Sequence, residues 1–194
     1  MIILPGDYFD NENYSINKRA VYALYNGIPI NVAYIPKQGD VVIGKILAEK
    51  KKVAYIVDIF SYNVYSIMMK NIYENFEIGD VVIGVIDKEE LKDVKKLEGG
   101  FLIKVPPSKV GRIIGTKGNM INLIKKLTKT EIYVGYNGAI YLKSGDIQKA
   151  IEIIYSVEKR AHLKELTEYI KQNFGEKNET WWKKTRWSKK SNKP

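Results

Sequence analysis

A short glycine-flanked turn is the feature of this sequence best suited to binding chemistry. The run Ile-Ile-Gly-Thr-Lys-Gly sets Gly115 and Gly118 around a tip made of Thr116 and Lys117. Glycine has no Cβ, so a phosphate backbone can approach such a turn closely. N–H groups at the start of a following helix favour phosphate, and Arg112 and Lys117 add positive charge. The spacing therefore predicts a clamp on a nucleic-acid backbone; the alternative is a helix–turn–helix corner with no ligand.

The positive charge of the chain is concentrated around this turn and near the C-terminus. The 194 residues carry 32 Lys and Arg against 22 Asp and Glu, a formal net charge of +10. Residues 104–145 hold eight basic residues and one acidic residue, residues 176–194 hold seven and two, and residues 1–103 have a net charge of −2. A solvated surface spreads its charge more evenly, whereas clustered Lys and Arg are typical of contact with a polyanion. This distribution favours nucleic-acid contact in the first block.

Several kinds of chemistry are excluded by residue types that are missing. The chain has no cysteine and one histidine, His162, which excludes disulfides, thiolate metal sites and multi-histidine metal sites. It has no Gly-x-x-x-x-Gly-Lys-Ser/Thr phosphate loop, and no Ser/His/Asp arrangement can be defended. We therefore expect neither enzymatic activity nor a cofactor. Asp87, Glu89 and Glu90 form an acidic cluster, which leaves a metal-dependent nuclease as an alternative.

The same composition predicts a cytoplasmic location. The N-terminal sequence Met-Ile-Ile-Leu-Pro-Gly-Asp lacks the basic region of a signal peptide. No apolar run approaches the length of a membrane span, so we expect no membrane partner. The absence of cysteine fits a reducing compartment.

The first half of the chain predicts two small β units. Residues 20–25 and 28–35 flank an Asn-Gly pair, which suits a two-residue hairpin turn. From residue 36, short β-branched strands alternate with tight turns, and Gly-Asp-Val-Val-Ile-Gly occurs at 39–44 and again at 79–84. About 60 residues of this kind suit a five-stranded OB-type barrel in which each Gly-Asp turn leads into a strand.

The second half predicts the element order strand, helix, helix, strand, strand, helix. A hinge-like Glu-Gly-Gly break at 98–100 precedes a strand, and another Asn-Gly turn separates strands at 130–134 and 139–142. A helical pattern runs from 147 to 174 after Asp146, a good N-cap. The apolar residues in the second half of this helical stretch need a surface to pack against, either in the same chain or in another chain. Residues 176–194 have no aliphatic residue and hold Trp181, Trp182 and Trp187, a composition typical of a disordered tail.

The predicted barrel holds further candidates for nucleic-acid contact. Its first hairpin turn is basic and consists of Lys50, Lys51 and Lys52. Three aromatic residues that follow are candidates for stacking on bases: Phe60, Tyr62 and Tyr65. A solvated turn and core aromatic residues are the alternatives. The loop around Gly115 and Gly118 is similar to the one that clamps about four nucleotides in KH domains. Several aliphatic residues could form an apolar floor on which the bases rest, although most of them are also expected in the hydrophobic core: Ile113, Ile114, Ile121, Ile132 and Val134.

Together these segments resemble the RNA-binding cap subunits of archaeal exosomes, which join an N-terminal domain, an S1-type OB domain and a KH domain. The resemblance covers residues 1 to about 175. It rests on Leu4-Pro5-Gly6-Asp7, Tyr34-Ile35-Pro36, the first Gly-Asp-Val-Val-Ile-Gly run, Val57-Asp58-Ile59, Gly99-Gly100, residues 110–121, and Val134-Gly135-Tyr136-Asn137-Gly138. The order OB then KH supports it further.

This resemblance implies an α+β multidomain protein. Its expected parts are a small N-terminal β domain (1–35), a five-stranded S1-type OB barrel (36–98), a KH domain with a long C-terminal helix (99–175) and a basic tail (176–194). It implies a non-catalytic cap, one of three on a ring of RNase PH-like subunits, which captures single-stranded RNA and feeds it 3′ end first to a phosphorolytic chamber. The N-terminal domain is shorter than is usual in the family.

Two other functions remain open at this point. One is an RNA-binding translation or transcription factor built on the same OB–KH pair. The other is an adaptor that works through protein contacts, which the last helix and the tryptophan-containing tail favour.

Overall fold

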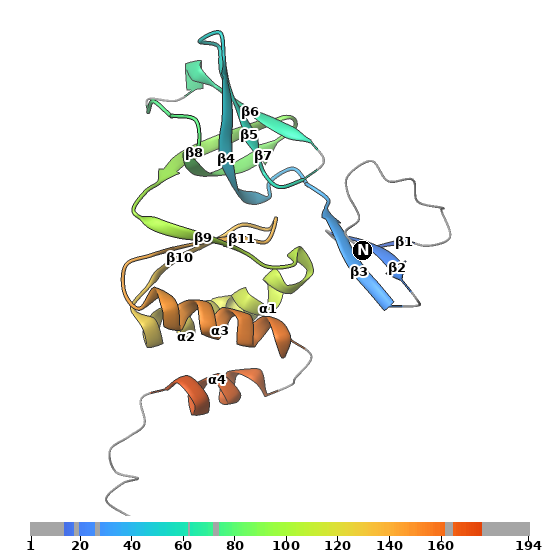
Figure 1. Ribbon diagram of the computed structural model, residues 1–194, viewed down its shortest axis with the longest axis vertical. Coiled ribbons are helices and arrows are strands. Elements are labelled where there is room, and N and C mark those ends of the chain that lie inside the picture. Colours follow the sequence, from blue (N-terminus) through green and yellow to red (C-terminus); the bar gives the residue numbers. More distant parts are fainter. Residues whose placement is uncertain are drawn as a thin grey trace, which may run out of the picture.

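The computed structural model describes three modules that follow one another along the chain (Figure 1). A three-stranded sheet comes first, a closed barrel second, and a three-stranded sheet covered by helices third. The residues described are 14–17, 20–25, 28–61, 63–71, 74–161 and 165–175. His162, Tyr62 and the tail 176–194 lie outside them. None of the helices in these ranges is long and apolar enough to cross a membrane.

The N-terminal sheet contains the predicted hairpin. Its antiparallel strands β1 (Tyr14–Asn17), β2 (Ala20–Tyr25) and β3 (Ile28–Tyr34) lie in that order. Strand β3 is an edge strand of this sheet, as expected for a strand with a proline at position 29. The hairpin prediction is confirmed by the pairing of Tyr25 with Ile28.

The barrel has the strand order of an OB fold. Its strands are β4 (Val41–Lys50), β5 (Ala54–Asp58), β6 (Val64–Met68), β7 (Val81–Asp87) and β8 (Glu90–Leu97), and a short 3-10 helix η1 (Met69–Asn71) follows β6. They close in the order β4-β5-β6-β8-β7, with β6 and β8 parallel. Inward-facing residues fill the interior, among them Val42, Ile46, Val57, Ile59, Tyr65, Ile67, Val82 and Leu91. The predicted five-stranded barrel is confirmed.

The repeated hexapeptide pairs with itself across this barrel. Strands β4 and β7 are antiparallel, and Ile43 lies opposite Ile83 at the centre of the pair. The flanking glycines make equivalent bonds, because Gly39 N donates to Ile86 O and Gly79 N donates to Ile46 O. Both glycines have positive φ, 84° and 99°, which favours glycine at each turn. The two copies are therefore related by a local twofold symmetry.

The third module has the β-α-α-β-β-α order expected of a KH domain. Its elements are β9 (Gly100–Lys104), η2 (Pro107–Lys109), α1 (Val110–Ile114), η3 (Thr116–Gly118), α2 (Asn119–Thr128), β10 (Glu131–Val134), β11 (Ala139–Lys143), α3 (Ile147–Lys159) and α4 (Leu166–Phe174). The sheet order is β10-β11-β9. Asp146 caps α3 as predicted, since its carboxylate accepts a hydrogen bond from Lys149 N.

The structure corrects the expectation of one long C-terminal helix. Helix α3 ends at Lys159 and α4 starts at Leu166. In a continuous helix Leu166 would lie about 120° around the axis from Ile154, away from the buried stripe of α3. The break instead lets α4 fold back, so that Leu166 and Ile170 are buried in the same core as Ile154. The second half of the helical stretch therefore packs against the core of its own chain.

The barrel and the KH domain are joined through a buried asparagine. Asn137, in the β10–β11 turn, is 5% exposed. Its Nδ2 donates to Ile43 O at 2.7 Å and to Ile59 O at 2.8 Å, and its Oδ1 accepts from Ile43 N at 3.3 Å. One side chain thus satisfies backbone groups of β4 and of the segment after β5. The sequence predicted an Asn-Gly turn here, but not a contact 94 residues away.

Close backbone approach also occurs within the KH sheet beside this junction. A Cβ on Gly100 would lie 2.3 Å from Leu142 O and 2.6 Å from the Tyr141 ring, so only glycine fits. Tyr141 packs beneath the barrel in a buried cluster with Ile43 and Ala139. The sequence suggested a hinge at Gly99 and Gly100, but in the structure Gly100 is required by tight packing.

We predict that Asn137→Ala lowers the free energy of unfolding by about 3 kcal/mol, because it leaves buried backbone groups on Ile43 and Ile59 without partners. Urea unfolding measures this. Asn122→Ala, an exposed site on α2, is the control and should change stability by less than about 0.5 kcal/mol. Equal effects of the two substitutions would contradict the role assigned to Asn137.

Candidate nucleic-acid interface

The glycine turn of the sequence forms the loop between α1 and α2. Helix α1 ends at Ile114, and the next residue, Gly115, has φ 75° and ψ 172°. At the tip Lys117 has φ 52°, and Gly118 has φ 77° immediately before α2. Thr116 and Lys117 are exposed. The loop therefore presents its two tip side chains to solvent, as predicted for a clamp.

The two glycines of the loop meet different constraints. A Cβ on Gly115 would lie 2.1 Å from Asn119 Oδ1 and 2.8 Å from Met120 N. A Cβ on Gly118 would meet nothing closer than 3.6 Å. Gly115 is therefore required by packing inside the loop, whereas a Cβ on Gly118 would make ordinary van der Waals contact and only the left-handed backbone favours glycine there. Because Gly118 carries no Cβ, the backbone at this end of the loop is left bare for the close approach of a phosphate.

The surroundings of the loop favour an anion. No side chain caps the N-terminus of α2, so its first N–H groups have no side-chain acceptor. The positive end of the helix dipole adds to this attraction. Arg112 is exposed on α1, one turn before the loop, and Lys117 is exposed at its tip. The predicted residues Arg112, Gly115, Thr116, Lys117 and Gly118 are thus brought together in one place.

The apolar residues that the sequence offered as a floor divide into two groups. Ile113 is 0% exposed and Ile132 is 5% exposed, and both belong to the KH core. Ile114, Ile121 and Val134 are only partly buried and pack on the edge of that core. Ile114 and Ile121 come from α1 and α2, which flank the loop, and Val134 comes from β10 on the same core. Only this second group is available to bases.

The basic turn of the barrel lies far from the glycine loop. Lys50, Lys51 and Lys52 are all exposed at the β4–β5 turn. Figure 1 shows this turn at the end of the barrel that points away from the KH helices. Lys51 and Lys52 have φ values of 45° and 58°, a conformation in which Asn and Gly are favoured over lysine. Two candidate contacts therefore exist in different domains, one in the KH domain and one at the far end of the barrel.

The aromatic candidates of the barrel have other partners. The Phe60 ring is partly buried against the cluster beneath the barrel, and Lys104 Nζ lies 3.4 Å from its centroid. Its backbone N donates to Asp58 Oδ1. Tyr65 is 7% exposed inside the barrel, where burial raises the pKa of its hydroxyl. Tyr65 therefore belongs to the barrel core, which is the alternative that the sequence left open for it.

The acidic cluster of the β7–β8 turn is engaged in local pairing. Asp87 forms an ion pair with Lys92 and accepts a hydrogen bond from Gln38 Nε2 at 3.2 Å. The hydrogen bond from Lys92 holds the pKa of the Asp87 carboxyl below its usual range. Within the described part of the chain, no group of three or more Asp, Glu, His or Cys side chains is arranged to hold a metal ion.

Comparisons with known proteins agree with this arrangement. The KH domain family model matches residues 101–156. A relative from Methanothermus fervidus, named exosome complex component Rrp4, is 36% identical over 214 residues, covering 88% of this chain and 93% of the relative. A protein of the same name from Methanobrevibacter smithii is 37% identical, but this chain spans only 55% of its length. A crystal structure assigned as an exosome complex RNA-binding protein aligns with a TM-score of 0.66 at 25% identity, over 74% of this chain and 96% of that one.

The loop geometry predicts an order of stability among three alanine variants. Gly115→Ala should lower the free energy of unfolding by about 3 kcal/mol, because its Cβ would clash inside the loop. Gly118→Ala should cost about 1 kcal/mol, from its backbone conformation alone. Gly111→Ala is the matched control in α1, where a Cβ meets nothing within 4 Å, and it should leave stability unchanged or raise it slightly. Urea unfolding of the three variants measures the order, and a Gly118→Ala cost equal to that of Gly115→Ala would contradict it.

Proposed function

Because the chain belongs to the Rrp4 family of archaeal exosome components, we propose that it is a non-catalytic cap subunit that captures single-stranded RNA. In this proposal the RNA passes 3′ end first to a phosphorolytic ring of RNase PH-like subunits, and three copies of the cap surround the entrance of the ring. The work of the chain is binding and positioning, and the cleavage belongs to other subunits. Its place is the cytoplasm.

The glycine loop is the observation that carries this proposal. It combines a backbone without a Cβ at Gly118, a helix N-terminus without a side-chain cap and two exposed basic residues. Beside it lie the partly exposed aliphatic side chains of Ile114 and Ile121. A single strand can lay its phosphates along the loop and its bases on these apolar side chains. A duplex has no unstacked bases to offer, so the arrangement favours single-stranded RNA.

The basic turn of the barrel supplies a second contact in this proposal. Nucleic-acid contact gives a reason for lysine at 51 and 52, where backbone conformation alone favours Asn and Gly. Because Figure 1 places this turn at the end of the barrel opposite the KH helices, a short oligonucleotide held by the glycine loop does not reach it. A longer strand that reaches both sites is held at two points along its path, so it should bind more tightly than a short oligonucleotide.

We predict that Gly118→Asp weakens binding of single-stranded RNA by about tenfold or more, because it sets a carboxylate against the phosphates. Aspartate tolerates the left-handed conformation, so the loop should remain folded. Fluorescence anisotropy with a labelled oligonucleotide measures the affinity at several salt concentrations. Wild-type affinity should fall steeply with salt, and the variant should show a shallower salt dependence.

Lys171→Ala is the control for that experiment. It makes the same change in net charge at an exposed position on α4, away from the loop. We expect this control to bind RNA within about twofold of the wild type. Equal affinities of Gly118→Asp and wild type at moderate salt would remove the glycine loop from the proposal.

The proposed partners predict what the protein captures from an archaeal extract. Immobilised full-length chain should recover RNase PH-like subunits, identified by mass spectrometry after nuclease treatment. Nuclease treatment removes proteins that are tethered only through RNA. Recovery of ribosomes or RNA polymerase without ring subunits would instead support a translation or transcription factor.

A further inference from the structure

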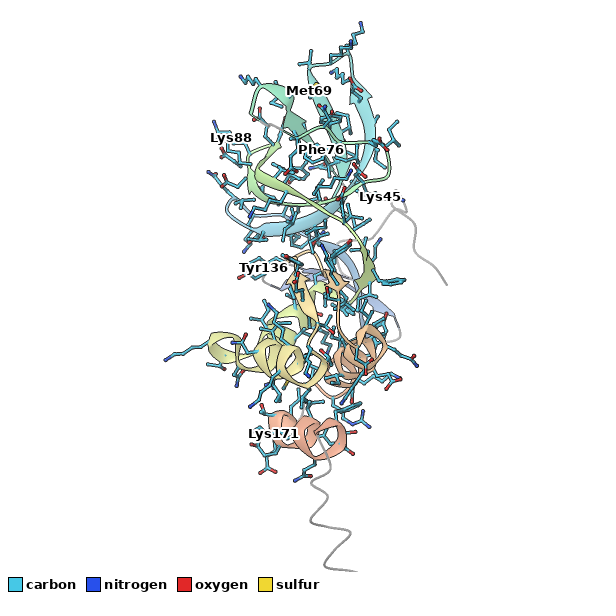
Figure 2. All side chains as sticks on the ribbon, turned by 90° about the vertical axis from the view of Figure 1, so that its left-hand side faces the viewer. Lys45, Met69, Phe76, Lys88, Tyr136 and Lys171 are labelled. Carbon is cyan, nitrogen blue, oxygen red and sulfur yellow. The ribbon has the colours of Figure 1, made fainter. Side chains whose placement is uncertain are left out.

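Tyr136 occupies the point where the KH domain meets the barrel. It lies two residues after Val134, the last residue of β10, which packs partly buried on the same KH core as Ile114 and Ile121 of the helices that flank the glycine loop. Its side chain packs against the KH core and also against the barrel core, and it is partly exposed. Figure 2 shows it at the junction of the two domains. Of the aromatic residues that the structure describes, it alone packs against both cores.

The backbone on both sides of this ring is held firmly. Tyr136 N donates to Val41 O of the barrel at 2.8 Å. The preceding Gly135 lies so close to β4 that a Cβ there would be 2.8 Å from Ile43 N. The following residue is Asn137, which makes three hydrogen bonds across the junction. The backbone that carries the ring is thus fixed before any ligand arrives, and the ring packs on both cores, so a base that stacks on it would order few additional groups.

Other aromatic side chains are less suited to a base that leaves the glycine loop. Tyr55, Tyr65 and Phe76 lie in the barrel core. Tyr133 is 37% exposed, but its neighbours Ile132 and Val134 point to the helices, so Tyr133 lies on the opposite face of the sheet. Tyr155 is 38% exposed, but it lies on α3, which does not flank the glycine loop.

We propose that Tyr136 is a stacking platform for one nucleobase of an RNA strand that passes from the glycine loop towards the barrel. This inference rests on the proposed RNA binding at that loop. Every base has a π-face, so stacking here contributes affinity without a strong sequence preference. Because Tyr136 lies at the junction, a base stacked on it also directs the RNA strand from the KH domain onto the barrel.

Substitution of the ring tests the platform. Tyr136→Leu should weaken single-stranded RNA binding by about tenfold, whereas Tyr136→Phe, which keeps the ring, should stay within about twofold of the wild type. Tyr155→Leu removes an exposed tyrosine of α3 and should leave the affinity unchanged. Equal affinity of Tyr136→Leu and wild type, or equal losses in the Leu and Phe variants, would overturn the stacking role.

Photo-crosslinking separates stacking from a purely structural role of Tyr136. The unmodified protein is irradiated with single-stranded RNA that carries 5-iodouridine, and the crosslinked peptides are mapped by mass spectrometry. We expect crosslinks at Tyr136, a result that loosening of the junction in a variant cannot produce. RNA binding that depends on Gly118 without a crosslink at Tyr136 overturns this inference alone. Binding that is indifferent to Gly118→Asp overturns the proposed function and this inference with it.

Discussion

The hydrogen bonds of one buried amide hold the two larger modules of this protein in a fixed relation. A carboxamide carries both donors and an acceptor, and Asn137 uses them on Ile43 and Ile59 at once. An aliphatic residue at this position would fill the space but leave buried peptide groups without partners, which is costly. The junction is therefore specified by polar geometry, and the surrounding apolar contacts of Ile43 and Tyr141 reinforce it.

This fixed junction determines what the separate binding elements can do together. The glycine loop and the basic turn each present exposed basic side chains on the surface of the protein. Because the domains are locked through Asn137 and through Lys104 over the Phe60 ring, the two elements keep a constant separation and orientation. A flexible tether would let a bound strand relax into many paths, whereas this arrangement favours one path along the surface.

The sequence predicted local features well and contacts between distant residues poorly. The barrel, the KH element order, the Asp146 cap and the clustering of the loop residues follow from short-range patterns. The roles of Asn137 and Gly100 depend on partners about 40 to 90 residues away, which no periodicity reveals. The break after α3 was missed because no proline or glycine marks it. A change in the phase of the apolar stripe between Ile154 and Leu166 is the signal that was available.

The local twofold pair of β4 and β7 has a consequence for association between chains. Each copy of Gly-Asp-Val-Val-Ile-Gly is complementary to the other in antiparallel register, and so is nearly complementary to itself. In the closed barrel no edge of this pair is available. If the barrel opens, β7 of one chain can pair with β7 of another and keep isoleucine opposite isoleucine. Closure of the barrel thus protects the folded chain against a strand exchange that its own repeat encodes.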